Sequence, residues 1–407
     1  MNDYQENFHN YLLYLKKIVG GGYVPFLQNE WHDNDLIKLK NINASNKINA
    51  KHDEKVYELL KKYYGPNYYI FLTNSGRSAL LLILKNLDLK KNDEIIIPSY
   101  SCLGLVQPIL KLGLKPYFVD INNDLGISFK SIKKAINKNT KVIIIPHLGG
   151  SFSKDTFKIL ELAKKKNILA IEDGCQSLGL EINKKPVGTF SDISFFSFGE
   201  GKPILSSGGG YVLTKKKSLI NNTSMLAEEN FEEIIKRVKL FKEKYSKSYF
   251  KRSMSRVFTH LLSLNTKDDP KLSSFDIYKF NKVEEFLVLN QLKNIDKIIE
   301  SRQVNANLWK SNLLNKFKKL NFINHSHSIY NKLYILNDTR FDYRKYFILN
   351  AIEIEDGYKP LHLRYDFKKF PKTDLINTNL MWKKIFSLPT RPSIKKNYLK
   401  NIIYNLT

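Results

Sequence analysis

The chain has 407 residues, of which 43% are hydrophobic and 26% charged. This size and composition exclude a mostly disordered chain and are typical of a large domain joined to a smaller one. The polar start and the lack of an apolar run of about 20 residues predict a cytosolic protein without a signal peptide or membrane span. The two cysteines, Cys102 and Cys175, are too few for a disulfide framework and lack metal-ligand spacing.

The formal net charge of +27 would attract acidic small molecules, nucleic acid or an anionic surface. The lysines are dispersed, however, and no recognised nucleic-acid motif accompanies them. We therefore expect a solvated surface that attracts phosphorylated small molecules, without a specific nucleic-acid site.

In chain order, residues 1–60 are an N-terminal segment with a flexible turn at Gly20–Gly22. Residues 61–221 then alternate short β-rich runs with helical patterns, which predicts an α/β catalytic domain with a mostly parallel sheet. The expected strands are Tyr68–Leu72, Glu94–Ile97, Pro116–Val119, Lys141–Ile145, Ile168–Glu172, Ile193–Ser197 and Gly210–Leu213. The expected helices are Ser78–Leu87, Leu103–Leu112, Phe129–Ile136 and Asp155–Lys165.

Residues 222–276 predict a basic helical insertion whose pattern breaks down around Asp268–Pro270. Residues 277–407 predict a smaller C-terminal α+β domain. Its expected elements are one long helix or two abutting helices over Val283–Leu314, a strand over Lys332–Leu336, and helices over Tyr343–Leu349 and Tyr398–Tyr404.

The first candidate site follows the first strand, at Thr73–Ser78, where a helix begins. The N–H groups and dipole of a helix N-terminus bind anions, and Gly76 would let the backbone approach a phosphate closely. Taken alone, this pattern favours a simple N-cap at Ser75, because a serine before a helix usually plays that role.

The second candidate is Asp173, at the carboxyl edge of the predicted sheet, where the ligands of parallel sheets bind. A carboxylate there can hold a heterocyclic nitrogen protonated, so that a pyridine ring acts as an electron sink. The alternative is that Asp173 only caps the next helix.

The third candidate is Lys202, in a glycine-bearing turn that Pro203 would fix. A lysine in a semi-buried turn can have a lowered pKa, the condition for its amine to form a Schiff base with an aldehyde. The alternative is a surface lysine in a loop. Together, however, the three sites follow the order of the phosphate, ring nitrogen and aldehyde partners that pyridoxal phosphate (PLP) needs.

Over residues 60–214 the chain resembles the DegT-type sugar-nucleotide aminotransferases, a branch of the fold-type I PLP enzymes. The interval from Asp173 to Lys202 resembles the family's own. The strong resemblance rests on Asn74–Leu80, Pro98–Cys102, Pro146–Gly150, Glu172–Gln176 and Phe196–Phe198 with Lys202 after it. A looser resemblance extends through Tyr278–Asn281, Leu289–Leu292, Tyr358–His362 and Leu388–Pro389.

The resemblance implies that Lys202 is the Schiff-base lysine, that Asp173 partners the pyridine nitrogen and that Gln176 lies near the ring hydroxyl. It implies a phosphate site formed by Ser75, Gly76, Arg77 and Ser197, with Cys102 against the ring and Lys279 reaching the neighbouring subunit's phosphate. His362 is a candidate substrate contact, although a loop histidine is as often structural.

The resemblance also implies an obligate homodimer with shared active sites, a nucleotide-linked keto-sugar as acceptor, glutamate as the usual donor, and a role in surface polysaccharide or glycan synthesis. Relatives that dehydrate sugars typically carry histidine in place of the lysine, so Lys202 argues against a dehydratase. The pattern also fits a transaminase for a non-sugar ketone, or a non-catalytic regulator of the same fold that binds nucleic acid.

Three departures from the family put the substrate in doubt. Cys102 stands where many members stack an aromatic residue on the ring, and Ile277 stands where the partner subunit usually supplies an asparagine to the phosphate. Ser207–Gly210 reads Ser-Gly-Gly-Gly where the family usually has Gly-Glu-Gly-Gly. The insertion at residues 222–276 is also longer than usual.

Overall fold

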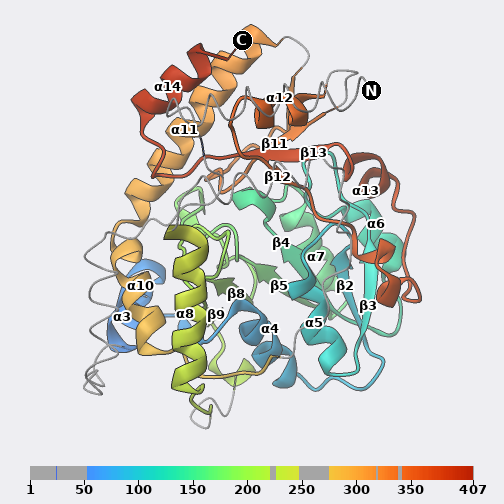
Figure 1. The fold of residues 1–407 in the computed structure, drawn as a ribbon. Coiled ribbons are helices and arrows are strands. Elements are labelled where there is room, and N and C mark those ends of the chain that lie inside the picture. Colours follow the sequence, from blue (N-terminus) through green and yellow to red (C-terminus); the bar gives the residue numbers. More distant parts are fainter. Residues whose placement is uncertain are drawn as a thin grey trace.

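The computed structural model describes residue 24 and residues 53–220, 226–246, 275–317, 320–337 and 342–406. Figure 1 shows a central sheet flanked by helices, with a smaller group of strands and helices at one end. The predicted turn at Gly20–Gly22 and the break at Asp268–Pro270 lie outside the described residues.

A seven-stranded sheet forms the centre of the larger unit, in the order β1-β9-β8-β5-β4-β2-β3. β9 runs in the opposite direction to the other six strands, and all pairs without β9 are parallel. The predicted α/β class with a mostly parallel sheet is therefore confirmed. Every predicted strand is present within one residue at each end: β1 Tyr69–Thr73, β2 Glu94–Pro98, β3 Lys115–Val119, β4 Thr140–Pro146, β5 Leu169–Asp173, β8 Ile193–Ser197 and β9 Gly210–Thr214.

The helices of this unit cover the sheet and return the chain to the same starting edge. They are α4 Gly76–Lys85, α5 Leu103–Lys111, α6 Phe129–Ala135 and α7 Thr156–Lys165. All residues of β2 and β8 are buried, as expected for strands covered on both faces. Because β1 and β8 are both antiparallel to β9, the carboxyl ends of β1, β5 and β8 meet at one edge.

A helix that the sequence pattern did not predict precedes the sheet. α3 spans Asp53–Tyr64 and therefore crosses the boundary predicted at residue 60. Its Val56, Leu60 and Tyr64 side chains pack in one buried cluster with Phe196 of β8. The short hairpin of β6 (Glu181–Ile182) and β7 (Lys185–Pro186) was not predicted either.

The C-terminal unit contains an antiparallel four-stranded sheet in the order β10-β11-β13-β12. Two abutting helices, α10 Lys282–Lys293 and α11 Ile295–Lys316, precede it, which was one of the two predicted arrangements. The remaining elements are β10 Asn321–Phe322, β11 Leu333–Leu336, α12 Tyr343–Leu349, β12 Glu355–Asp356, α13 Ile376–Met381, β13 Ile385–Leu388 and α14 Lys396–Tyr404. Of these, the sequence predicted β11, α12 and α14.

Within the predicted insertion, the structure describes one long helix, α8 Phe231–Ser246. Ile234 and Val238 of this helix are buried against Leu205 and against α10. No described helix is long and apolar enough to cross a membrane. Within the same part of the chain, no group of histidine, cysteine and acidic residues could hold a metal ion.

Candidate active site

The loops that follow β1, β5 and β8 are in direct contact at the sheet edge. A Cβ added to Gly76 would lie 2.7 Å from Cβ of Ser197 and 3.1 Å from Sγ of Cys175. The structure therefore brings the predicted phosphate loop, the loop after Asp173 and the end of β8 together. A side chain at position 76 would push them apart, which is why glycine is needed there.

Ser75 is the N-cap of α4, as its sequence pattern alone favoured. Its Oγ accepts a hydrogen bond from the Ser78 N–H at 3.1 Å. Arg77, in the first turn, donates from Nη1 to Oε1 of Gln107 at 2.9 Å, and its guanidinium lies 5.0 Å from the ring centre of Phe275. The side chain of Ser197 accepts from the Gly199 N–H at 3.2 Å.

Asp173 ends β5 and shapes the turn that follows. Its Oδ1 accepts a hydrogen bond from the Cys175 N–H at 3.0 Å. The described residues between β5 and β6 form no helix, so Asp173 caps a turn and not the helix that the alternative expected. Its carboxylate also acts electrostatically on the Lys202 amine. The structure therefore brings the predicted ring-nitrogen carboxylate and the predicted Schiff-base lysine into one site.

The Lys202 turn is held from both sides. Gly201 has a left-handed backbone with φ of 73°, which glycine adopts readily, and the Lys202 N–H donates to the Gly199 carbonyl at 3.3 Å. From the C-terminal unit, Nδ2 of Asn331 donates to the Gly201 carbonyl at 2.9 Å. Hydrogen bonds from both units thus hold the backbone around Lys202 at the sheet edge.

The expected lowering of the Lys202 pKa is wrong in direction. Burial does lower the pKa of Lys202, but the neighbouring acidic groups raise it by more, so the net shift is upward. The groups responsible are, in order, Cys175, Cys102, Tyr358 and Asp173. They come from the loops after β2 and β5 and from the C-terminal unit, and their convergence on the amine of the half-buried Lys202 marks the centre of the site.

Gln176 joins the two units beside this centre. Its Oε1 accepts from the Gly149 N–H at 2.8 Å, and its Nε2 donates to the Tyr358 hydroxyl at 3.0 Å. The Tyr358 ring packs edge-on against Tyr100 at 5.8 Å between ring centres. Tyr358 was missed as a site residue, although the motif at Tyr358–His362 had already singled out its segment.

Two predicted site residues lie elsewhere. His362 is buried, with Nδ1 hydrogen-bonded to Oγ of Ser99 at 2.7 Å and Nε2 to Oδ1 of Asn379 at 3.1 Å, which favours the structural alternative. Lys279 is exposed, and its backbone N–H donates to the Ala227 carbonyl at 3.0 Å. No described contact joins its side chain to the group around Lys202.

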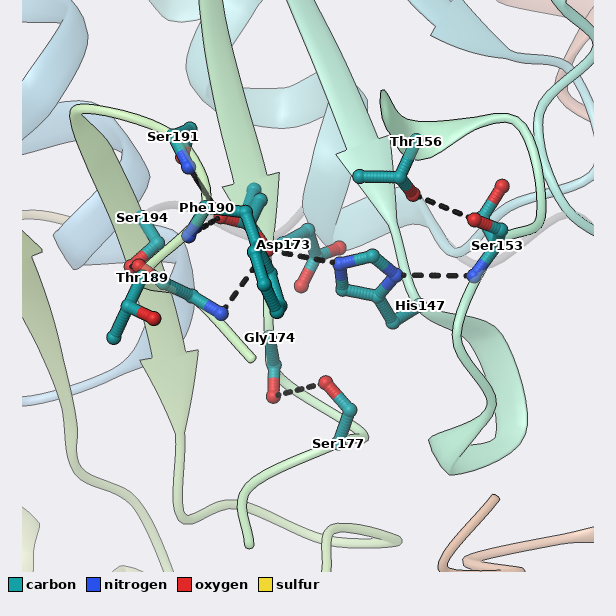
Figure 2. Close-up of polar contacts among 12 residues, drawn as sticks. His147, Ser153, Thr156, Asp173, Gly174, Ser177, Thr189, Phe190, Ser191 and Ser194 are labelled. Carbon is teal, nitrogen blue, oxygen red and sulfur yellow. Dashed lines mark hydrogen bonds and ion pairs between the residues drawn. The ribbon is translucent and has the colours of Figure 1, made fainter. Parts of the chain in front are cut away.

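A buried network of hydrogen bonds adjoins Asp173, and Figure 2 shows its members His147, Ser153, Phe190 and Ser191. Glu172 is fully buried, and its carboxylate accepts from the N–H groups of Gly188, Phe190 and Ser191, from the Ser191 hydroxyl and from Nε2 of His147. Since the Ser153 N–H donates to Nδ1 of His147, the ring proton belongs on Nε2, facing Glu172. The His147 N–H also donates to the Asp173 carbonyl at 3.1 Å, which fixes the end of β5.

This network predicts the pH dependence of stability. Burial raises the pKa of Glu172, but hydrogen bonds from His147, Ser191 and Gly188 lower it below its ordinary value overall. A lowered carboxyl pKa contributes stability above the unfolded-state value, and this contribution is lost as pH falls from there through the folded-state value. We expect Glu172→Gln to lower the free energy of unfolding at pH 7 by about 2–4 kcal/mol, because an amide cannot accept at every oxygen position.

Urea unfolding of both proteins at pH 7 and pH 4 measures this difference. The difference in the free energy of unfolding between wild type and Glu172→Gln should be smaller at pH 4 than at pH 7. A gap that is constant across this range would show that the charge of Glu172 does not stabilise the fold.

Comparisons with known proteins agree with this geometry. The family model for DegT/DnrJ/EryC1/StrS aminotransferases matches residues 32–407. A GDP-perosamine synthase of Escherichia coli O157:H7 is 38% identical over 152 residues, which are 37% of this chain and 42% of that protein. The chain thus matches less than half of that relative's length.

Solved structures share the fold over nearly the whole chain. The Helicobacter pylori aminotransferase of pseudoaminic acid biosynthesis has a TM-score of 0.72 at 20% identity, covering 94% of this chain and 98% of that one. The E. coli GDP-4-keto-6-deoxy-D-mannose-3-dehydratase with bound hydrated PLP has a TM-score of 0.69 at 20% identity, covering 93% and 99%. These neighbours confirm the predicted fold-type I architecture. By its sequence and its fold, the chain belongs to the DegT/DnrJ/EryC1/StrS aminotransferase family of PLP-dependent enzymes.

Proposed function

We propose that this chain is a PLP-dependent transaminase that moves an amino group from an amino acid, with glutamate as the expected donor, to a nucleotide-linked keto-sugar. The observation that carries the proposal is the amine of the half-buried Lys202, on which Asp173, Tyr358 and both cysteines act at the carboxyl edge of the sheet. A lysine at this position, in place of histidine, favours transamination over sugar dehydration.

The described residues fit the phosphate end of PLP. Gly76 keeps the helix N-terminus open beside Ser197, since a Cβ there would meet that side chain at 2.7 Å. We propose that Ser75, Gly76, Arg77 and Ser197 hold the phosphate through backbone N–H groups, hydroxyls and the guanidinium charge. The partner subunit would add its exposed Lys279.

The residues around Lys202 fit the ring. When bound, PLP supplies an aldehyde that bonds to amines and a protonated pyridine that withdraws electrons from the neighbouring carbon. Asp173 would keep the ring nitrogen protonated through a charge-assisted hydrogen bond. Gln176 would lie near the ring hydroxyl, and Cys102 would offer a thin, polarizable contact to its face.

Lys202 has two successive tasks in this proposal. With PLP bound, its amine would hold the cofactor through the aldehyde carbon in the resting enzyme. After the donor amino acid has taken its place, the free Lys202 amine would act as the base that takes the proton from the donor's Cα and as the acid that returns a proton to the cofactor carbon. The second half-reaction, with the keto-sugar, runs the same proton transfers in reverse.

We further propose that the enzyme works in the cytosol as a homodimer with shared active sites, in surface polysaccharide or glycan synthesis. The free thiols of Cys102 and Cys175 beside Lys202 suit a reducing compartment, where they persist as thiols. Exposure of Lys279 leaves it available to a second subunit.

The test is to incubate the PLP-loaded protein with glutamate and GDP-4-keto-6-deoxy-D-mannose, and with UDP- and dTDP-linked keto-sugars in parallel. We expect an amino sugar and 2-oxoglutarate in equal amounts from at least one acceptor. Loss of a sugar hydroxyl without incorporation of amino nitrogen would favour a dehydratase. Failure with every nucleotide-sugar, together with sequence-selective DNA binding at physiological salt, would favour a regulator.

A further inference from the structure

The inserted helix α8 packs on the segment that joins Lys202 to β9. Ile234 and Val238 of α8 form a buried cluster with Leu205 of that segment and with Val283 and Leu287 of α10. Figure 1 shows α8 beside α10, in agreement with their shared apolar cluster. The insertion is thus in direct contact with the segment after the catalytic lysine.

A charged junction accompanies this apolar contact. Arg237 of α8 donates from Nη1 and Nη2 to both carboxylate oxygens of Glu229, at 2.6 and 3.0 Å, and from Nη2 to Oε1 of Glu284 at 2.7 Å. The Glu284 side chain is 0% exposed, whereas that of Arg237 is 32% exposed. A buried carboxylate is costly unless a cation and hydrogen bonds compensate it, and Arg237 supplies both.

The carboxylate of Glu284 lies against the turn at Ser207–Gly210. The Ser207 hydroxyl donates to Oε1 of Glu284 at 3.4 Å, and a Cβ added to Gly208 would collide with the same oxygen. The turn lacks the glutamate that the resembling family usually has at this position. In this chain α10 places a carboxylate in the space that a side chain at position 208 would take.

The same turn is hydrogen-bonded to the predicted phosphate loop. The Gly209 N–H donates to the Asn74 carbonyl at 2.7 Å, and the two segments form a bridge between Ser75 and Gly209. A Cβ added to Gly210 would lie 2.6 Å from the backbone nitrogen of Gly76. A shift of Glu284 would therefore be transmitted to the N-terminus of α4.

We propose that Arg237 is a positioning residue for the cofactor: it holds an ionised Glu284 against the turn at Ser207–Gly210, and through that turn it fixes the phosphate loop at Asn74–Gly76. This inference rests on the proposed PLP function and gives the insertion a role in it.

Titration of Glu284 follows from the same contacts. With Arg237 beside it, Glu284 has a pKa raised to about 7, because burial and Glu229 raise the pKa by more than Arg237 and Asn281 lower it. Among the described residues, the other polar side chains hydrogen-bonded to Glu284 are those of Ser207 and Asn281, which do not titrate in this range. At pH 8 most of the Glu284 carboxyl is therefore ionised, whereas without Arg237 its pKa would rise further and the turn would lose the ion pair that stabilises it.

The experiment compares PLP affinity in Arg237→Met, in Glu284→Gln and in the double variant, by titration at pH 8 and 15 °C. Lys239→Met is the matched control, because Lys239 is exposed on the same helix. We expect Arg237→Met to bind PLP roughly tenfold more weakly than wild type, since the ion pair that holds Glu284 against the turn is lost. Lys239→Met should bind as wild type does. The double variant should bind within about threefold of Glu284→Gln, because a neutral amide needs no counter-charge.

Equal PLP affinity in wild type and Arg237→Met would overturn the inference and leave the proposed function intact. A wild-type protein that binds no PLP would instead overturn the proposed function. If Arg237→Met does not fold, the inference is tested by comparing the PLP affinity of the double variant with that of Glu284→Gln. A double variant that binds far more weakly than Glu284→Gln would show that Arg237 does not act through Glu284.

Discussion

Lys202→Ala is expected to abolish both the yellow colour of the PLP-loaded protein and its transaminase activity, with a loss of turnover of roughly 10⁴-fold or more. The reason is that, in the proposed function, one amine has two tasks: it holds the cofactor covalently and moves the proton at Cα. Alanine can do neither. An absorbance scan after addition of PLP, followed by an assay of amino-sugar formation, measures both losses.

Lys164→Ala is the matched control, because Lys164 is an exposed lysine in the last turn of α7. It should keep the colour and full turnover. A Lys202→Ala protein that stays yellow and turns over at the wild-type rate would mean that another amine holds the cofactor.

Asp173→Asn is expected to keep the fold and slow Cα deprotonation by about 10²–10⁴-fold. The fold should survive because an asparagine Oδ1 can still accept the hydrogen bond from the Cys175 N–H. A neutral amide, however, cannot hold a protonated ring nitrogen, so the ring no longer withdraws electrons strongly. Single-turnover kinetics with glutamate isolate this step from product release.

Asp173 is the one carboxyl residue in the described β5 loop, Asp173–Gln176, so this substitution tests that carboxyl group alone. Unchanged single-turnover rates in Asp173→Asn would show that a different acid partners the ring nitrogen. Thermal unfolding of the variant close to that of wild type would confirm that the measured loss is chemical.

The sheet and its helices could be predicted because their patterns are local. β8, Ile193–Ser197, is a short β-rich apolar run, and its predicted bounds are those in the structure. Parallel strands buried on both faces show such runs clearly. The edge at which Asp173 and Lys202 meet then follows from the direction of the strands.

Elements held by distant contacts could not be predicted. β13, Ile385–Leu388, has four residues and is defined by pairing with β11 and β12. α3 depends on packing against Phe196, far along the chain. A segment as short as β13 carries too few residues for a periodic pattern to appear. α3 has 12 residues, and its Val56, Leu60 and Tyr64 recur at helical spacing, so its pattern was present in the sequence but was overlooked.

The details of the site depended equally on distant partners. Gln176 bonds to Tyr358, which is 182 positions away, and no local pattern predicts that contact. The predicted shift of the Lys202 pKa was wrong in direction, because the sequence of the turn indicates burial but does not show which acidic groups surround the amine. The two thiols and the tyrosine that raise that pKa come from segments that only the fold brings together.

The most direct test of the central claim is to reduce the PLP-loaded protein with borohydride and map the modified peptide by mass spectrometry. Reduction makes the bond between the cofactor and its lysine permanent, so the attachment site can be read from the fragment ions. We predict that the reduced pyridoxyl group is found on Lys202. Modification of another lysine, or no modification of a protein that had been saturated with PLP, would contradict this assignment.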